Sequence, residues 1–162
     1  MTPRRRFVSW SLLAFAALMA FGAGPAAAQG RSARDIPYAT NFTITVATNS
    51  NGNGVFSPDA VPLNKRLVIE YVSVSVFAQS GDKPSLFLSD LVNGAGRNYW
   101  IPLTLVDAAG PGGMEVYRAS QLVKLNHDGN GVNGPGAHCG RYYNTYAPVT
   151  CSLTISGYLV DK

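Results

Sequence analysis

Short stretches in which apolar and polar residues alternate run through most of the chain. Phe42, Ile44 and Val46 are separated by threonines, a spacing that places the three apolar side chains on one face of a strand. Residues 66–80 are rich in β-branched and aromatic side chains, which favour a strand over a helix. Clusters of Gly, Pro, Asn and Asp separate such runs and supply turns. Further strands are expected at 85–91, 98–106, 114–119, 121–126 and 151–161.

Seven or eight short strands at this spacing predict an all-β fold. The first expectation is a two-sheet antiparallel sandwich with a jelly-roll-like winding, and the alternative is an immunoglobulin-like sandwich. The alternative has one weakness, because Cys139 and Cys151 are too close in sequence to form the usual inter-sheet bridge of that fold. Pro102 falls inside a predicted strand, so we expect it at a sheet edge or a bulge.

The start of the chain has the layout of an export signal. Arg4 to Arg6 precede an uncharged apolar run, and small residues follow up to Ala28. An uncleaved anchor is the alternative, because about 20 apolar residues can span a bilayer. The arginines fit the twin-arginine route, which exports folded chains, as well as an ordinary signal. The predicted parts are a signal peptide at 1–28, a polar leader at 29–40 and a β-sandwich domain at 41–162.

Removal of the signal peptide changes the charge of the protein. The chain has 13 lysines and arginines against 9 acidic residues, and cleavage removes three arginines, which leaves 13 − 3 = 10 and a net charge near +1. The remaining basic residues are scattered, so we expect no nucleic-acid partner. We expect a bacterial protein of the periplasm or the extracellular space that has no membrane contact after cleavage.

The two cysteines, Cys139 and Cys151, both lie in the part that would be exported. In an oxidising compartment they predict a disulfide, which would stabilise the fold by about 3 kcal/mol. A zinc site is disfavoured, because zinc sites usually take cysteine ligands in closely spaced pairs.

Three segments carry a resemblance to known proteins: RLVIEYVSVSV at 66–76, YRASQLVKLNHDG at 117–129 and CSLTISGYLVDK at 151–162. Over about residues 60–162 the chain resembles a group of small exported bacterial proteins without an assigned activity, in which a sandwich ends in a cysteine-containing strand leading to Ser-Gly-Tyr-Leu-Val. This resemblance implies a fold and a compartment. The segment from Ile155 to Leu159 is also similar to the last strand of the C1q and tumour-necrosis-factor jelly rolls, which implies a homo-oligomer such as a trimer.

His127, Asp128 and His138 are the residues that most resemble metal ligands, or a general base with its orienting acid. Either site would require the two imidazole rings to converge on one ion or one nucleophile. The segment between the histidines is rich in glycine and holds no geometry by itself. A surface loop between the last two strands is therefore the favoured interpretation, and a hydrolase or metal-dependent enzyme is the alternative.

Aromatic residues supply a second set of candidates. Tyr142, Tyr143 and Tyr146 cluster beside Arg141, and Trp100 lies near the start of another predicted strand. Exposed rings with an adjacent arginine are typical of recognition surfaces, here for a carbohydrate or protein ligand. The structural alternative is that the tyrosines pack at the rim of the core with their hydroxyls in water.

The sequence favours an exported, non-enzymatic module that acts through its surface in structure or in binding. No cofactor is implied, and the Gly-x-Ser-x-Gly motif of serine hydrolases is absent from the sequence. Glu70 and Glu115 could meet across a sheet as a glycosidase pair, although exposed strand positions explain both equally well.

Overall fold

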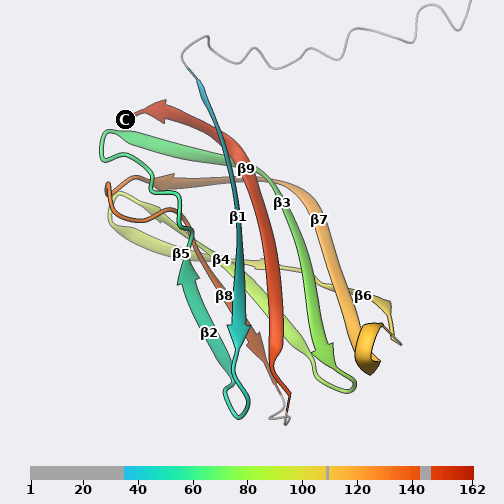
Figure 1. Cartoon of the computed structure of the whole chain (residues 1–162). Helices are drawn as coiled ribbons and strands as arrows, with labels where there is room; N and C mark the ends of the chain where they lie inside the picture. Colours follow the sequence, from blue (N-terminus) through green and yellow to red (C-terminus); the bar gives the residue numbers. More distant parts are fainter. Residues whose placement is uncertain (1–34, 109, 143–146) are drawn as a thin grey trace, which may run out of the picture. The chain divides into compact units, whose positions relative to one another are not determined.

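The computed structural model describes residues 35–108, 110–142 and 147–162, and most of them lie in β-strands (Figure 1). A single 3-10 turn at Pro111–Gly113 is the one helical element of the described residues, and none of them forms a helix that could cross a membrane. The prediction of an all-β fold is therefore confirmed. The strands are β1 (Ile36–Val46), β2 (Gly52–Phe56), β3 (Lys65–Gln79), β4 (Pro84–Val92), β5 (Ala95–Ile101), β6 (Thr104–Asp107), β7 (Met114–Asp128), β8 (Gly136–Arg141) and β9 (Val149–Asp161).

The strands belong to one nine-stranded sheet with the order β1-β9-β3-β7-β4-β8-β2, to which β5 adds beside β4 and β6 beside β7. We call β1, β9, β3 and β7 the first half of the sheet, and β5, β4, β8 and β2 the second half. The chain passes repeatedly from one half to the other, which makes the winding jelly-roll-like, as predicted. In the immunoglobulin alternative the first two strands share a sheet, whereas here β1 and β2 stand at opposite ends of the strand order.

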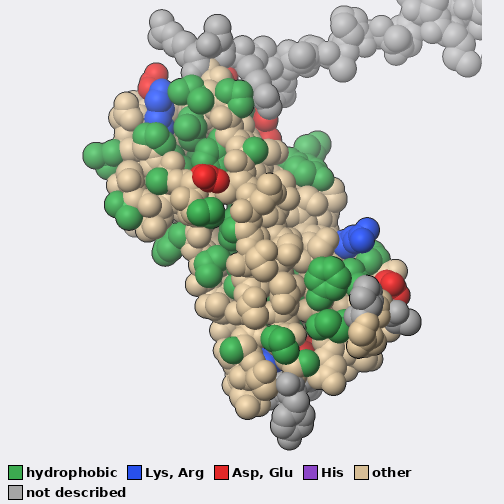
Figure 2. Space-filling model, viewed as in Figure 1, with side chains coloured by type: hydrophobic (Ala, Val, Ile, Leu, Met, Phe, Trp, Pro, Cys, Tyr) green, Lys and Arg blue, Asp and Glu red, His purple; other side chains and the backbone are tan. Residues whose placement is uncertain are grey.

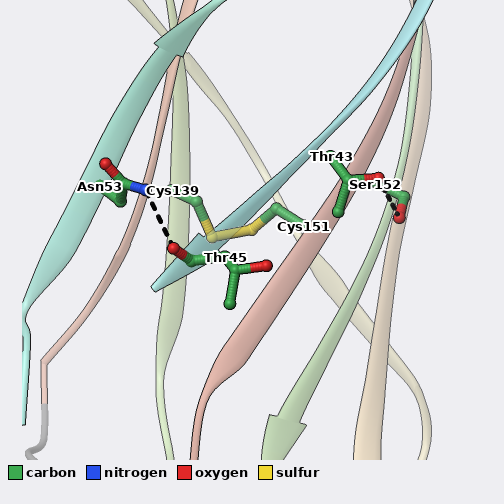
Figure 3. Close-up of a disulfide and its surroundings, with 6 residues drawn as sticks. All are labelled: Thr43, Thr45, Asn53, Cys139, Cys151 and Ser152. Atoms are coloured by element: carbon green, nitrogen blue, oxygen red, sulfur yellow. Dashed lines mark hydrogen bonds between the residues drawn. A yellow bond between two sulfur atoms is a disulfide. The ribbon is translucent and has the colours of Figure 1, made fainter. Parts of the chain in front are cut away.

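The two halves are linked at both margins, so the sheet curls nearly into a barrel (Figure 1). At one margin β4 and β7 meet at a single parallel bridge between Leu91 and His127. At the other margin, the Asn53 amide on β2 donates to the backbone oxygen of Thr45 on β1 at 3.0 Å (Figure 3). The structure thus differs from the predicted pair of separate sheets, because these contacts connect what would be the two layers.

Alternation along each strand decides which side chains fill the interior. In β9, Leu153 and Ile155 are buried while the intervening Thr154 faces outward. In β4, Leu86 and Leu88 are buried in the same way. Burial of each such aliphatic side chain contributes about 1.5–3 kcal/mol. The same alternation leaves every second residue of each strand on the outer surface, where the candidate site is built.

The disulfide between Cys139 and Cys151 is present, as predicted, with a Cα–Cα distance of 6.3 Å (Figure 3). Cys139 lies in β8 of the second half and Cys151 in β9 of the first half, and both are buried. The bridge therefore crosses the interior between the halves. The two cysteines are close in sequence, but this does not prevent a bridge between the halves, because the chain crosses from the second half to the first between β8 and β9.

Several strand boundaries differ from the sequence predictions. β2 and β8 were not predicted, because their glycines are typical of turns, yet the two strands pair with each other. β7 is one continuous strand where two were expected, and Pro102 lies in the break between β5 and β6. β1 begins at Ile36, inside the predicted polar leader, and pairs there with Leu159 near the end of β9.

Candidate functional site

His127 lies at the end of β7 and points into the interior, where its side chain is 3% exposed. Neither of its ring nitrogens has a hydrogen-bond partner among the residues that the structure describes. Burial lowers the pKa of the ring, because the charged form would lose its hydration, while Asp128 and Asp90 act in the opposite direction. The ring is therefore a neutral part of the core near the margin where β4 meets β7.

Asp128 is occupied by partners other than the histidine beside it. Its carboxylate accepts hydrogen bonds from Arg66 Nε at 2.6 Å, from Arg66 Nη2 at 3.3 Å and from the backbone N–H of Asn93 at 2.8 Å. These bonds, with Arg66 the largest cause, lower the pKa of Asp128 to about 2. Asp128 thus ties the ends of β7 and β3 to the turn after β4, and it does not orient His127 as a base.

His138 lies on the opposite side of the sheet from His127. It follows the buried Ala137 and precedes the buried Cys139 in β8, so its ring faces outward, where it stacks on Phe87 with a centroid distance of 4.9 Å. The structure therefore does not bring His127 and His138 together. Among the described residues, no group of three or more His, Cys, Asp or Glu side chains could hold a metal ion.

The glycine-rich segment is less exposed than a surface loop. His127, Asp128 and residue 129 are buried, as are residues 134–137, and only the stretch from 130 to 132 is exposed. A side chain at Gly129 would place its Cβ 1.9 Å from the backbone oxygen of Pro62, so the chain packs there against the loop after β2. The expectation of a loose surface loop is wrong for most of this segment, because neighbouring backbone covers it.

Arg141 is also part of the framework and not of an exposed recognition surface. It is 4% exposed, and its guanidinium donates to the backbone oxygens of Ser50 and Ala47 at 2.8 Å each, and to that of Ala147. Its Nη1 lies 3.5 Å from the buried carboxylate of Asp82. Arg141 therefore holds together the loops at the end of the molecule drawn at the bottom of Figure 1.

The predicted tyrosine cluster is described only in part. Tyr142 is 72% exposed, as a recognition residue would be. Tyr143 and Tyr146 lie outside the described residues. The tyrosine candidates therefore remain a prediction, whereas the predicted Trp100 has a defined environment.

Trp100 belongs to a row of three rings on the outer surface of the second half. The register places Trp100 of β5 opposite Phe87 of β4, and Phe87 opposite His138 of β8. The Trp100 and Phe87 rings meet edge to face with centroids 5.0 Å apart, and Phe87 and His138 stack in parallel. Such aromatic pairs contribute about 0.5–1.5 kcal/mol beyond the area they bury.

The surface around this row is uncharged. None of the outward positions of β5, β4, β8 and β2 carries Asp, Glu, Lys or Arg. Phe56 on β2 is 60% exposed and Trp100 is 57% exposed. Ser89 donates a hydrogen bond to the Asn98 side chain at 3.1 Å. We define the aromatic face by its outward side chains Phe56, Phe87, Ser89, Asn98, Trp100 and His138.

Glycines open a hollow in the aromatic face. Gly54 and Gly136 flank His138 and Phe56, and a Cβ on either glycine would come within 3.3 Å of one of these rings. The resulting hollow of about 330 Å³ lies between Phe56, Phe87 and His138 and is mostly apolar. The rings are therefore accessible from the side as well as from above.

The outer surface of the first half has a different composition. At the middle of β1, β9 and β3 the outward positions carry small hydroxyl and amide side chains, and the middle of this side of the molecule is largely tan in Figure 2. The Thr154 hydroxyl donates to the Asn41 side chain at 2.6 Å, and the Thr43 and Ser152 hydroxyls are 3.4 Å apart (Figure 3). We define the hydroxyl face by Asn41, Thr43, Ser73, Ser75, Ser152 and Thr154.

The two glutamates considered as a glycosidase pair do not meet. Glu115 pairs in register with Ala78, near the end of β3 that is remote from Glu70. Glu115 accepts a hydrogen bond from Tyr117 at 2.7 Å, which is the main cause of its lowered pKa, and burial together with Glu115 raises the pKa of Tyr117 to about 12. Glu115 is therefore an ionised partner of Tyr117.

The aromatic face was only partly predictable. Trp100 was selected as a candidate, but Phe87 and Phe56 were not, and His138 was considered only as a metal ligand. The available signal was Phe87 itself, which occupies an outward position of β4 between Ser85 and Ser89. An aromatic residue on the polar side of an alternating strand indicates an exposed ring.

No family model and no curated protein matches this sequence. Two viral structures resemble the fold. The cyanophage Pam1 capsid asymmetric unit matches over 83% of this chain and 93% of its own, with 12% identity and a TM-score of 0.42. A virus-like particle of the extra small virus of the giant freshwater prawn Macrobrachium rosenbergii matches over 83% of this chain and 86% of its own, with 15% identity and a TM-score of 0.32. At scores this low, neither likeness assigns the chain a family or a function.

Proposed function

We propose that this chain is exported and acts as a non-enzymatic binding module whose working surface is the aromatic face. The observation that carries the proposal is the exposure of large rings on a sheet face without charges, since Phe56 and Trp100 are 60% and 57% exposed. Exposed apolar patches rimmed by polar groups are typical of interaction sites. The leader at 1–28, with its arginines and apolar run, supports export to the periplasm or the extracellular space.

Binding is favoured over catalysis by the surroundings of the candidate catalytic residues. His127 is buried and has no hydrogen-bond partner within the described part of the chain, Asp128 is paired with Arg66, and His138 stacks on Phe87 on the outer surface. A hydrolytic site would need a base within hydrogen-bond reach of a nucleophile and of its orienting acid. These three side chains serve separate structural roles, which supports the binding module over the hydrolase.

The experiment compares binding to the cell envelope of the exporting bacterium. The full chain is expressed, the exported protein is recovered, and its co-sedimentation with envelope fragments is measured. We expect the natural protein to sediment with the fragments and a Phe56→Ser, Trp100→Ser variant to stay in solution. The matched control is Thr43→Ala, Ser152→Ala on the hydroxyl face, which should sediment normally. Equal behaviour of the three proteins would contradict the proposal.

Self-association is a separate part of the proposal. A homo-oligomer such as a trimer is implied by the similarity of the last strand to trimeric jelly rolls, and it remains a prediction. Sedimentation velocity of the exported protein tests it, because a defined oligomer and a monomer differ in sedimentation coefficient at the same concentration. A monomer at the highest soluble concentration would remove this part and leave the binding module intact.

A further inference from the structure

We infer that the aromatic face binds a neutral oligosaccharide chain, an inference that rests on the proposed function and names its ligand class. The first argument is charge. The outward positions of β5, β4, β8 and β2 carry no Asp, Glu, Lys or Arg. A nucleic acid or an acidic polymer would require basic side chains that neutralise its charges, and this face has none of them. The face therefore suits an uncharged partner.

The second argument is the pairing of rings with small polar groups. Aromatic rings carry negative charge density on their faces, which attracts the slightly positive C–H groups of a sugar ring. Beside the rings, Ser89 and Asn98 offer a hydroxyl and an amide at the surface. These groups can donate hydrogen bonds to sugar hydroxyls and accept them in return. A purely apolar partner could not form hydrogen bonds with Ser89 and Asn98.

The third argument is size. Trp100 lies on β5 and Phe56 on β2, the two outer strands of the second half, with β4 and β8 between them. Neighbouring strands are about 4.8 Å apart, so the two exposed rings are separated by roughly 14 Å across the sheet. A ligand that contacts both rings must be longer than one monosaccharide. The site therefore selects a chain of sugars over a single sugar.

The glycines provide the fourth argument. Gly54 has no positive φ that would require glycine, so its absence of a side chain is not dictated by the backbone. Its Cβ would lie 3.3 Å from the His138 ring, at the hollow between His138 and Phe56. The glycine therefore keeps open a space at the centre of the face, where the edge of a sugar ring can enter beside the aromatic rings.

The experiment uses Trp100 as its own reporter, because the only other tryptophan of the sequence is Trp10 in the predicted signal. The exported protein is titrated with cellohexaose, chitohexaose and laminarihexaose while the tryptophan emission is recorded. Pull-down on insoluble cellulose, chitin and β-1,3-glucan gives an independent measurement. We expect at least one of these neutral glycans to bind saturably and to shift the emission, and polygalacturonate to bind at least tenfold more weakly.

Two variants distinguish specific glycan binding from non-specific adsorption to the apolar surface. Phe56→Ser removes one ring, and Gly54→Val fills the hollow without removing any apolar surface. Each should weaken glycan binding by tenfold or more, whereas Thr43→Ala, Ser152→Ala should bind like the natural protein. Thermal unfolding is measured for each variant to verify that it is folded. Retained binding by both Phe56→Ser and Gly54→Val would overturn the inference.

Failure of the inference can be told apart from failure of the proposed function. If none of the three neutral glycans binds while envelope binding still depends on Phe56, the face is a binding surface for another class of partner, and the glycan inference is wrong. If Phe56→Ser instead converts an oligomer to a monomer, the occupant is a second copy of the chain, which also overturns it. If envelope binding is unaffected by Phe56, the proposed function itself fails.

Discussion

The two halves of the sheet have similar interiors and different outer surfaces. Inside, both present aliphatic residues such as Val74 in the first half and Leu88 in the second. Outside, the first half presents the hydroxyl face, whose side chains bond one another across the strands, and the second half presents the aromatic face. The jelly-roll winding requires the interior but neither of the two surfaces.

This difference shows where the molecule departs from what folding alone requires. Small hydroxyl side chains on an outward strand position are a solvated default, because water and neighbouring hydroxyls satisfy them equally well. Trp100 and Phe56 have no such reason to face water, since each could bury far more apolar surface inside the sheet. The aromatic face is therefore the surface whose composition calls for a functional explanation.

The largest expected effect concerns the contacts that make the two halves one folding unit. Arg141→Met removes the buried guanidinium and leaves Asp82 and three backbone oxygens without it. We expect a loss of about 3–5 kcal/mol in the free energy of unfolding, measured by guanidinium titration. The control is the exposed Arg118→Met, which should change stability by less than about 0.5 kcal/mol. A loss below about 1 kcal/mol for Arg141→Met would show that the loops do not depend on it.

The disulfide gives the next largest effect, because it connects the halves covalently. A Cys139→Ala, Cys151→Ala variant should lose about 3 kcal/mol, as expected for a bridge that closes a short loop of the unfolded chain. The midpoint of denaturant unfolding measures the change. The natural protein treated with a reductant should move to a similar midpoint, and no shift in either sample would contradict the role assigned to the bridge.

His127 tests the margin where the halves meet through β4 and β7. Because burial lowers its pKa in the folded state, only the unfolded chain takes up the proton as pH falls below about 6.5, so stability should decline with acidification in that range. His127→Leu should remove this decline and, by removing two unpartnered buried nitrogens, add about 1 kcal/mol at pH 8. Asp128, Asp90 and Lys162 also act on the pKa of the ring. The natural protein and His127→Leu are therefore compared by urea titration at each pH, and the difference between them gives the contribution of His127.

Below about pH 4 a second decline should appear in both proteins of that comparison. The pKa of Asp128 is lowered to about 2, so the stability that its ionised form contributes is present above the ordinary aspartate value and is lost as pH falls toward 2. Asp128→Asn should flatten this second decline, and it should deepen the first, because the carboxylate that raises the pKa of His127 is lost. If His127→Leu abolished both declines, the second one would not come from Asp128.

The smallest expected effects sharpen the contrast between the two faces. Thr43→Ala, Ser152→Ala should change the free energy of unfolding by less than about 0.5 kcal/mol, because its cross-strand contact is long and exposed. Phe56→Ser should cost less than about 1 kcal/mol, because the ring is mostly in water. Differential scanning calorimetry resolves both. A large loss of unfolding free energy for Phe56→Ser would mean that the ring stabilises the fold. The contrast between the aromatic face and the hydroxyl face would then fail.

The alternating strands were predictable, because burial follows their sequence pattern directly. β3 and β9 were located from alternating Val, Ile and Leu, and the single pair of cysteines indicated the disulfide. β2 and β8 were missed, because glycines occupy most of the outward positions of these short strands and leave too little alternation to detect. Their pairing partners, which lie far away in the sequence, make them strands.

The candidate site was less predictable than the fold, for a related reason. Arg141 was grouped with its tyrosine neighbours in sequence, but its partners are Ser50, Ala47 and Asp82, which only the winding brings close. The row of Trp100, Phe87 and His138 joins the consecutive strands β5 and β4 to β8, which lies far from both in the sequence. Register across strands, which single-sequence patterns do not contain, decides both arrangements.

The pairing of Ile36 with Leu159 places the two ends of the folded domain side by side. A carrier protein or a solid support attached through either end would therefore hold the domain by the same edge. A short linker between these ends would also permit a circularly permuted version that opens at the exposed Gly112 and Gly113, with the order of strands in space unchanged. The domain is thus suited to insertion into a loop of a carrier protein.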